Sequence, residues 1–344
     1  MTVTIKDIAK LANVSTTTVS RVINNKYEGV GEETRKRILD LVKELGYQPN
    51  ALARSLVTKR TSSIGLIIPD IINPFFPDLA RGVEDIASKE GYSVILCNTD
   101  DDPDKEKKYI SLLNEKRVDG IIFTGASTHS HEHILELIKS GVPVILMDRR
   151  IDYENTFGVF IENFKGGYDA TNYLISLGHK KIGCITGPLN TKESEERFNG
   201  YKKALKEAGI DFNEDLVIES NYKITGGADA ATELLEKQNV TAIFAFNDMM
   251  AYGVYKAAKL LGLKIPDDIS VIGFDDVQIS QILEPELTTV KQPIYDMGAE
   301  SAKMLITRIK GKKIKKKIIK FKTELIIRES TKDVTKVYEE VKDE

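Results

Sequence analysis

Charge divides this chain of 344 residues into a small basic head and a large acidic body, which indicates two parts with different tasks. Residues 1–60 hold 11 Lys and Arg against 6 Asp and Glu, whereas the whole chain carries a net charge of −3. The head is therefore at +5 and the body at −8. This asymmetry favours a head that meets a polyanion and a body with a different task.

The head has the pattern of a helix-turn-helix. Thr4 and Asp7 have the spacing of a capping box, and the apolar residues after Thr4 share one helix face: Ile5, Ile8, Ala9 and Ala12. Asn13 suits a tight corner because Asn tolerates the left-handed conformation. Ser15 can cap the next helix, and a third helix is expected over residues 32–45.

The second helix turns small polar side chains outward and ends near an arginine. The outward residues are Ser15, Thr16, Thr17, Ser20 and Arg21. Short hydroxyl side chains let a helix approach base edges, and Arg can hold guanine with two hydrogen bonds. Double-stranded DNA is therefore the predicted polyanion. The alternative is a generic three-helix surface domain with a solvated Thr-rich helix.

Residues 49–60 predict a short basic helix between head and body. Pro49 and Asn50 can start it, and Leu52 and Leu56 give it one apolar edge. Such an edge is suited to entering the minor groove as a wedge. The alternative is a plain linker whose leucines pack on the body.

The segment from Thr4 to Asn24, followed by Ala53-Arg-Ser-Leu56, resembles the headpiece and hinge helix of the lac-repressor (LacI/GalR) family, and the likeness continues to about Ser330. The resemblance implies a repressor, not an enzyme, which binds a pseudo-palindromic operator as a homodimer. It implies that Thr16, Thr17 and Arg21 read the major groove and that Leu56 enters the minor groove. The other DNA-binding residues that it implies are Thr4, Ser15, Asn24, Tyr47, Asn50, Leu52 and Ala53. Val57 stands where several relatives place Lys, which leaves a contact there open.

In the body, short apolar runs alternate with helical patterns. The first runs are Ile64–Ile68, Val94–Cys97, Val118–Phe123 and Val142–Met147, and the second series is Val159–Ile161, Ile182–Ile185, Ala242–Phe246 and Ile269–Gly273. This alternation predicts an α/β body with two parallel-sheet, Rossmann-like lobes and a ligand cleft at the carboxyl ends of their strands. The expected parts are a headpiece (1–48), a hinge (49–60), a first lobe (61–161 plus about 292–322), a second lobe (162–291 plus about 323–332) and a charged tail (333–344).

Ten side chains near these strand ends form the predicted effector site. They are Asn73, Phe75, Phe76, Asp148, Arg149, Arg197, Tyr222, Asn247, Asp275 and Gln292. Planar carboxylate, guanidinium and amide groups can hold adjacent hydroxyls, and rings can cover the apolar faces of a sugar, so a neutral polyol fits them. An Asp after a strand can also be a plain helix N-cap, and we expect that role for Asp104 and Asp248.

These ten residues resemble the pentose contacts of periplasmic ribose-binding proteins, although Tyr222 stands where that family has Phe. The body also resembles ribose-operon repressors, as in Leu96-Cys-Asn-Thr99 and Lys116-Arg-Val-Asp-Gly120. The resemblance implies that D-ribose or a close pentose controls DNA affinity, by induction or by corepression. Four alternatives stay open: a transport-type binding protein, a sugar-converting enzyme, a catabolite-control regulator with a protein corepressor, and a regulator that responds to another sugar or a phosphosugar.

Other patterns in the chain argue for an ordinary cytoplasmic protein without a cofactor. There is no run of 18 apolar residues and no secretory signal pattern. Cys97 and Cys184 lie in apolar runs and are expected as buried thiols. The histidines in Thr128–His133 do not share a helix face, so no metal site is predicted. The eight Lys between Lys310 and Lys322 are expected on a solvated edge strand.

Overall fold

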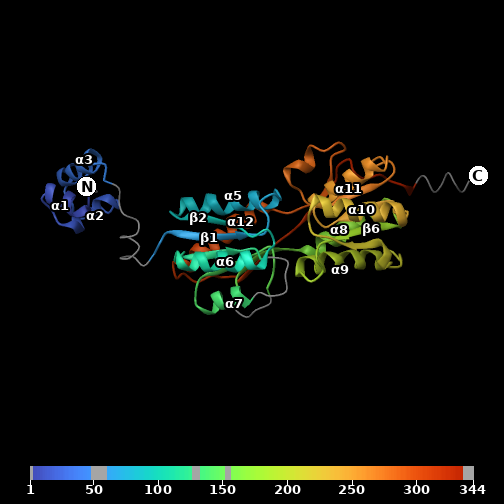
Figure 1. Cartoon of the computed structure of the whole chain (residues 1–344), viewed down its shortest axis with the longest axis horizontal. Coiled ribbons are helices and arrows are strands. Elements are labelled where there is room, and N and C mark those ends of the chain that lie inside the picture. Colours follow the sequence, from blue (N-terminus) through green and yellow to red (C-terminus); the bar gives the residue numbers. More distant parts are fainter. Residues whose placement is uncertain (1–2, 48–59, 126–131, 152–155, 336–344) are drawn as a thin grey trace, which may run out of the picture. The chain divides into compact units, whose positions relative to one another are not determined.

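The computed structural model of the chain describes residues 3–47, 60–125, 132–151 and 156–335. Contacts divide the chain into two compact units, Met1–Thr61 and Ser62–Glu344. Figure 1 traces the headpiece helices and the two lobes of the larger unit along the chain. No helix in these described ranges combines the length and the hydropathy that a membrane span requires.

Three helices build the first unit: α1 (Ile5–Leu11), α2 (Thr16–Ile23) and α3 (Glu32–Glu44). The Asp7 carboxylate accepts hydrogen bonds from Thr4 N at 2.9 Å and from Thr4 Oγ1 at 2.7 Å, and Ser15 Oγ accepts one from Thr18 N at 3.1 Å. Asn13 has a φ of 50°, the left-handed corner that its type favours. These local predictions are confirmed, although α3 ends one residue early, with Leu45 as its C-cap.

A small core holds the three helices together. Its fully buried side chains are Ile8, Ala12, Val19, Val22 and Ile38. Helices of this length are marginal alone, so this shared core supplies most of their stability, about 1.5–3 kcal/mol for each large side chain buried.

The first lobe of the body contains a parallel sheet with the order β11-β5-β4-β3-β1-β2. Its strands are β1 (Ser63–Ile68), β2 (Ser93–Asn98), β3 (Gly120–Phe123), β4 (Val144–Met147), β5 (Gly158–Ile161) and β11 (Ile318–Phe321). Although the sequence pattern places Val159–Ile161 first in the second series of runs, the predicted bounds of the first lobe (61–161) include this strand, and β5 hydrogen-bonds to β4 and β11. The lysine-rich segment puts its strand, β11, at the sheet edge.

Helices cover both faces of this sheet (Figure 1). Ile64, Leu66 and Ile68 pack with α5 (Phe75–Lys89) and α12 (Ile294–Ile309), whereas Ile67 packs with α6 (Pro103–Glu115) and α7 (Glu132–Lys139). Successive strand residues point to opposite faces, and both faces are apolar, which explains the continuous apolar runs.

The second lobe repeats the plan with the order β12-β10-β9-β8-β6-β7, in which only β12 runs antiparallel to its neighbour. Its strands are β6 (Ile182–Thr186), β7 (Val217–Glu219), β8 (Ala242–Ala245), β9 (Ser270–Asp275), β10 (Thr288–Lys291) and β12 (Glu324–Ile326). Its helices are α8 (Asn163–Ser176), α9 (Lys192–Glu207), α10 (Ile224–Lys237) and α11 (Asp248–Leu260), with short 3-10 turns η1 (Glu214–Leu216) and η2 (Gln278–Gln281). Together with the headpiece, the two sheets confirm the predicted fold class.

Candidate functional site: a pocket between the two lobes

One pocket lies between the lobes, where strands of both sheets end. All ten predicted effector residues line it. Six residues outside that prediction line it too: Pro69, Asp70, Asp101, Glu193, Asn221 and Lys223. The space amounts to about 550 Å³, including the part open to solvent.

Two phenylalanines from the first turn of α5 form an apolar wall. Phe75 and Phe76 are buried, and their rings meet edge to face with centroids 5.0 Å apart. The Asn73 Oδ1 atom accepts a hydrogen bond from Phe75 N at 3.1 Å, which holds the turn that presents both rings. A wall of this kind suits the apolar face of a sugar ring.

Arg197 is the central cation of the second lobe. Its Nε donates to Asn163 Oδ1 at 2.8 Å, its Nη1 donates to the Phe246 carbonyl oxygen, and its guanidinium stacks 3.7 Å above the Phe274 ring. These contacts use two of the five N–H donors of Arg197. A rigid guanidinium with remaining donors is thus held in the pocket wall, where it can bind oxygen atoms of a ligand.

Asp275 and Gln292 form a buried pair at the ends of β9 and β10. Gln292 Nε2 donates to Asp275 Oδ1 at 2.7 Å. Burial and the nearby Asp248 raise the pKa of Asp275 well above its ordinary value, against the opposing effect of Arg197. Within the described residues, the buried Oε1 atom of Gln292 has no hydrogen-bond partner, so it is an acceptor available to a ligand.

Tyr222 and Asn247 line the pocket together and are joined by a hydrogen bond. Asn247 Nδ2 donates to the Tyr222 carbonyl oxygen at 3.0 Å, and its Oδ1 caps α11 by accepting from Met250 N at 2.9 Å. The Tyr222 ring lies against Gly187, where a Cβ atom would be only 2.0 Å from it. Asn247 therefore positions Tyr222 as well as facing the pocket.

Arg149 connects the two lobes. Its Nη1 pairs with Asp101 at 3.0 Å and also donates to the Gly125 carbonyl oxygen, while its Nε lies 3.6 Å from Glu193 Oε1 on α9 of the other lobe. Burial acts to lower the pKa of Arg149, but the carboxylates of Asp101, Glu193 and Asp148 outweigh it and raise that pKa. Arg149 therefore stays charged, and its ion pair with Glu193 connects the first lobe to the second.

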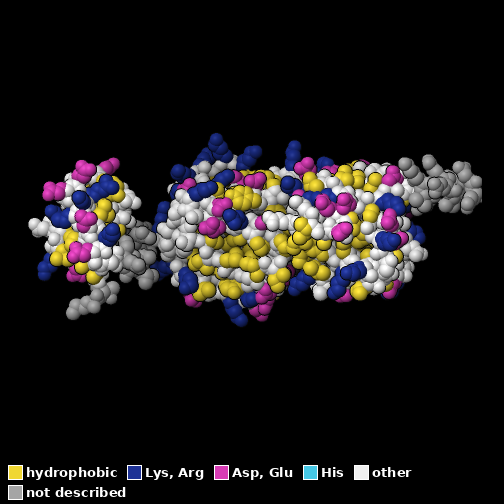
Figure 2. Space-filling view, turned by 90° about the horizontal axis from the view of Figure 1, so that it is seen from above, with side chains coloured by type: hydrophobic (Ala, Val, Ile, Leu, Met, Phe, Trp, Pro, Cys, Tyr) yellow, Lys and Arg dark blue, Asp and Glu magenta, His cyan; other side chains and the backbone are white. Residues whose placement is uncertain are grey.

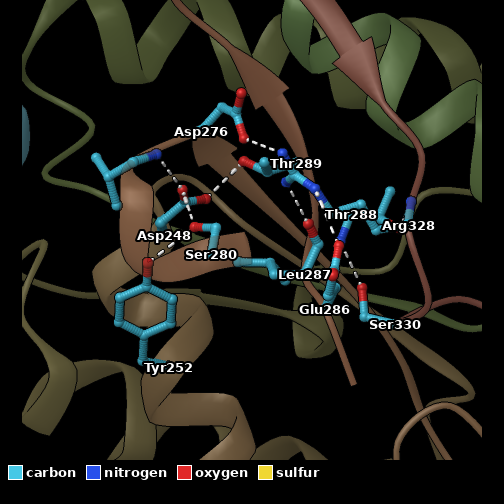
Figure 3. A network of polar contacts seen from close by, with 11 residues as sticks. Asp248, Tyr252, Asp276, Ser280, Glu286, Leu287, Thr288, Thr289, Arg328 and Ser330 are labelled. Atoms are coloured by element: carbon cyan, nitrogen blue, oxygen red, sulfur yellow. Dashed lines mark hydrogen bonds and ion pairs between the residues drawn. The ribbon is translucent and has the colours of Figure 1, made fainter. Parts of the chain in front are cut away.

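A second polar network, shown in Figure 3, joins α11 to the segment after β9 and to the start of β10. The buried Asp248 carboxylate accepts hydrogen bonds from Val277 N at 3.1 Å, from Ser280 Oγ at 2.6 Å and from Thr289 Oγ1 at 2.6 Å. The expected N-cap role of Asp248 is wrong, because Asn247 caps α11.

The N-cap prediction for Asp104 is wrong for the same reason. Asp102 caps α6, and its Oδ1 accepts from Asp104 N at 2.8 Å. In both helices the residue with the extended backbone is the cap, and the predicted residue already lies inside the helix.

The headpiece presents its predicted polar face to solvent. Thr4, Ser15, Thr16, Thr17, Arg21 and Asn24 are exposed, whereas Tyr47 and Ser20, the latter also predicted on the outward face, are half-buried. Asn50, Leu52, Ala53 and Leu56 lie outside the described residues, as do His129 and His131 of the histidine-rich segment. His133 pairs with Glu106, and the described part of the chain holds no group of three or more His, Cys, Asp or Glu placed to bind a metal ion. Cys97 and Cys184 are free and buried, as expected.

Of the pocket residues that the sequence did not predict, Asp101 and Glu193 matter most, because both pair with Arg149. Asp101 follows β2, so the rule that strand ends carry the site applies to it too. Glu193 lies four residues before Arg197 in α9, and this spacing places both on one helix face. Both signals were present in the sequence.

Two family descriptions match this chain. Residues 4–50 match the bacterial regulatory proteins of the lacI family, and residues 61–329 match the periplasmic binding proteins and sugar binding domain of the LacI family. Among similar proteins are the HTH-type transcriptional regulator DegA of Bacillus subtilis (42% identical), the ribose operon repressor of Halalkalibacterium halodurans (41%) and catabolite control protein A of Priestia megaterium (40%). Each alignment covers 96% of this chain and 97–100% of the relative. All three are regulators, not enzymes.

Solved structures of similar proteins agree with the LacI family match. The lac repressor dimer bound to operator and the anti-inducer ONPF superimposes with a TM-score of 0.86 at 26% identity, over 96% of this chain and 100% of that one. A LacI family regulator from Enterococcus faecium with bound ribose has a TM-score of 0.72 at 34% identity, over 79% of this chain and 99% of that one. From headpiece to second lobe, then, the chain belongs to the LacI family of bacterial transcriptional regulators.

Proposed function

We propose that this protein is a cytoplasmic repressor of a ribose-type sugar utilisation operon, whose affinity for operator DNA is controlled by a small sugar bound between its lobes. The observation that carries the proposal is the convergence of Asn, Asp, Arg and Gln side chains with two buried phenylalanine rings in one interlobe pocket. Polar groups that can hold adjacent hydroxyls beside an apolar wall are what a pentose requires.

The headpiece supplies the DNA-binding half of the proposal. The exposed Thr16, Thr17 and Arg21 on α2 suit the major groove, because hydroxyls and a guanidinium can reach base edges there. The role of Leu56 as a minor-groove wedge stays a prediction from the family resemblance.

The identity of the sugar is drawn from the pocket and from two relatives. Overall identity does not separate the effector classes, since regulators with different names lie between 40% and 42%. The relative named as a ribose operon repressor and the solved regulator with bound ribose favour D-ribose or a close pentose.

A homodimer completes the proposal. Figure 2 shows hydrophobic side chains gathered on one face of the body, over both lobes. Several large apolar side chains of the body are strongly exposed, with Ile72 at 77%, Leu260 at 76% and Ile282 at 80%. Apolar side chains gathered on one face are typical of interaction sites, and a two-fold dimer would match a pseudo-palindromic operator. We expect Ile282→Glu to shift the protein toward monomer in sedimentation velocity; an unchanged dimer would place the interface elsewhere.

Control of DNA binding then follows from linkage. The sugar contacts residues of both lobes, so it favours whichever interlobe arrangement brings them together. It can change operator affinity only by its different affinity for the DNA-competent and DNA-incompetent states.

Isothermal titration of the full chain with D-ribose tests the proposal. We expect one site per chain with an affinity of about micromolar or tighter, and a change in operator affinity in fluorescence anisotropy when ribose is added. An absence of heat with D-ribose would overturn the ribose assignment. Binding of ribose without an effect on operator affinity would overturn its role as effector.

A further inference from the structure

Glu193 is buried in the pocket yet has an unused acceptor. Its side chain is 5% exposed, and its Oε1 atom has no hydrogen-bond partner among the described residues. The nearest cation, Arg149 Nε, is 3.6 Å from this oxygen, too far for a normal hydrogen bond. A buried acceptor without a donor costs free energy, which a ligand hydroxyl could recover.

The charges around Glu193 are unfavourable for an anion. Five carboxylates line the pocket against three cations. The five carboxylates belong to Asp70, Asp101, Asp148, Glu193 and Asp275. Of the cations, the charge of Arg149 is already paired with Asp101, and Lys223 is exposed. Arg197 keeps free N–H donors, but its single charge faces the remaining carboxylates of the pocket, so a phosphate dianion would add to an excess of negative charge.

Burial also makes Glu193 sensitive to added negative charge. Burial raises the pKa of Glu193 to about 7, with Arg149 opposing this effect and Asp148 adding to it. Further negative charge beside a carboxylate that is already costly to ionise would be strongly disfavoured.

Resting on the proposed sugar effector, we propose that Glu193 determines effector specificity: its Oε1 accepts a hydrogen bond from a hydroxyl of a neutral polyol, and its charge excludes phosphorylated sugars. Gln292 Oε1 is a second buried acceptor without a partner in the described part of the pocket, so the effector must bring donors to two places. Hydroxyls do this, whereas a phosphate group in place of one of them offers only acceptors at that position.

Titration calorimetry at pH 8, where Glu193 is mostly ionised, with D-ribose and D-ribose 5-phosphate tests this inference. The wild-type protein should bind ribose at least about 100-fold more tightly than the phosphate. Glu193→Gln removes the charge and keeps the size, so ribose affinity should fall about 3–10-fold while affinity for the phosphate rises at least about tenfold.

The matched control is Glu195→Gln, because Glu195 lies on the same helix with its side chain 50% exposed and outside the pocket. This variant should leave both affinities unchanged, and a cooperative melting transition in each protein would show that all three are folded. If wild-type protein binds ribose but Glu193→Gln leaves the ratio of the two affinities unchanged, the specificity role is overturned. If wild-type protein prefers the phosphate, it is also overturned. If wild-type protein binds neither sugar, the proposal of a sugar effector is overturned, and the specificity role of Glu193 is overturned as well.

Discussion

At the scale of single residues, each proposed contact is a side chain whose chemistry is set by its surroundings. Arg21 is exposed on α2, whereas Arg197 is buried and contacts Asn163, the Phe246 carbonyl and the Phe274 ring. The same guanidinium group can therefore read DNA in one place and hold a small ligand in the other.

Arg21→Ala tests the reading of DNA. We expect a loss of about 1–3 kcal/mol of operator binding that is confined to one base pair in each half-site, because a bidentate contact to guanine would be removed. Binding to a set of operators with single base changes would measure it. An unchanged base preference at every position would contradict the assignment.

Asp275→Ala tests the pocket. Removal of a buried carboxylate that faces the ligand should weaken sugar binding at least about 100-fold. The headpiece is a separate compact unit, so operator affinity without sugar should stay within about twofold of the wild-type value. Titration calorimetry and anisotropy would measure the two effects. Loss of both activities would instead indicate that Asp275 is needed for folding.

At the scale of elements, the buried network around Asp248 joins the segment after β9 to the start of β10 (Figure 3). Asp275 and Asp276 have positive φ values of 131° and 59°, which non-glycine residues rarely adopt. Arg328 Nη2 pairs with Asp276 at 2.6 Å and its Nη1 donates to the Leu287 carbonyl at 2.8 Å. These contacts hold the turn that directs Asp275 to the pocket.

Asp248→Ala should destabilise the protein by about 3 kcal/mol or more, because three buried donors would lose their acceptor. Urea unfolding would measure it. The control is Asp296→Ala, which removes an exposed Asp from the first turn of α12 and should cost less than about 0.5 kcal/mol. Equal losses in the two variants would show that the Asp248 network contributes nothing specific.

At the scale of the whole molecule, buried acids make stability depend on pH. The pKa of Glu193 is raised from 4.5 to about 7 by burial, so between these values the folded chain binds more protons than the unfolded chain. Stability should therefore fall as the pH rises through this window and level off above it. Burial raises the pKa values of Asp148, Asp248 and Asp275 as well, and these shifts act in the same direction.

The contribution of Glu193 can be isolated by difference. Between pH 5 and pH 8, the free energy of unfolding of wild-type protein should decrease by about 2–3 kcal/mol more than that of Glu193→Gln. Urea denaturation at the two pH values would measure it. Parallel pH profiles for the two proteins would show that Glu193 has an ordinary pKa.

The sequence by itself determined the features that depend on near neighbours. The caps at Thr4 and Ser15, the corner at Asn13 and the apolar faces of the headpiece are set by residues three or four apart. The alternation of strands and helices is also local, and the rule that sites follow strand ends identified residues that line the pocket. Local steric and hydrogen-bonding preferences suffice for such predictions.

Only the tertiary structure decided which distant segments meet. The predicted lobe bounds assign β5 to the first lobe, but only the structure places it between residues 144–147 and 318–321 in the sheet. The structure also brings Arg149 to Asp101 and Glu193, which are 48 and 44 positions away in the sequence. Likewise, the Asp248 carboxylate binds Val277, Ser280 and Thr289 instead of capping a helix. The burial of these groups, their charge pairing and the unpaired acceptors of Glu193 and Gln292 within the described pocket all arise from the packing of several elements. Each depends on which groups lie within a few ångströms in space, and not on which residues are adjacent in the chain.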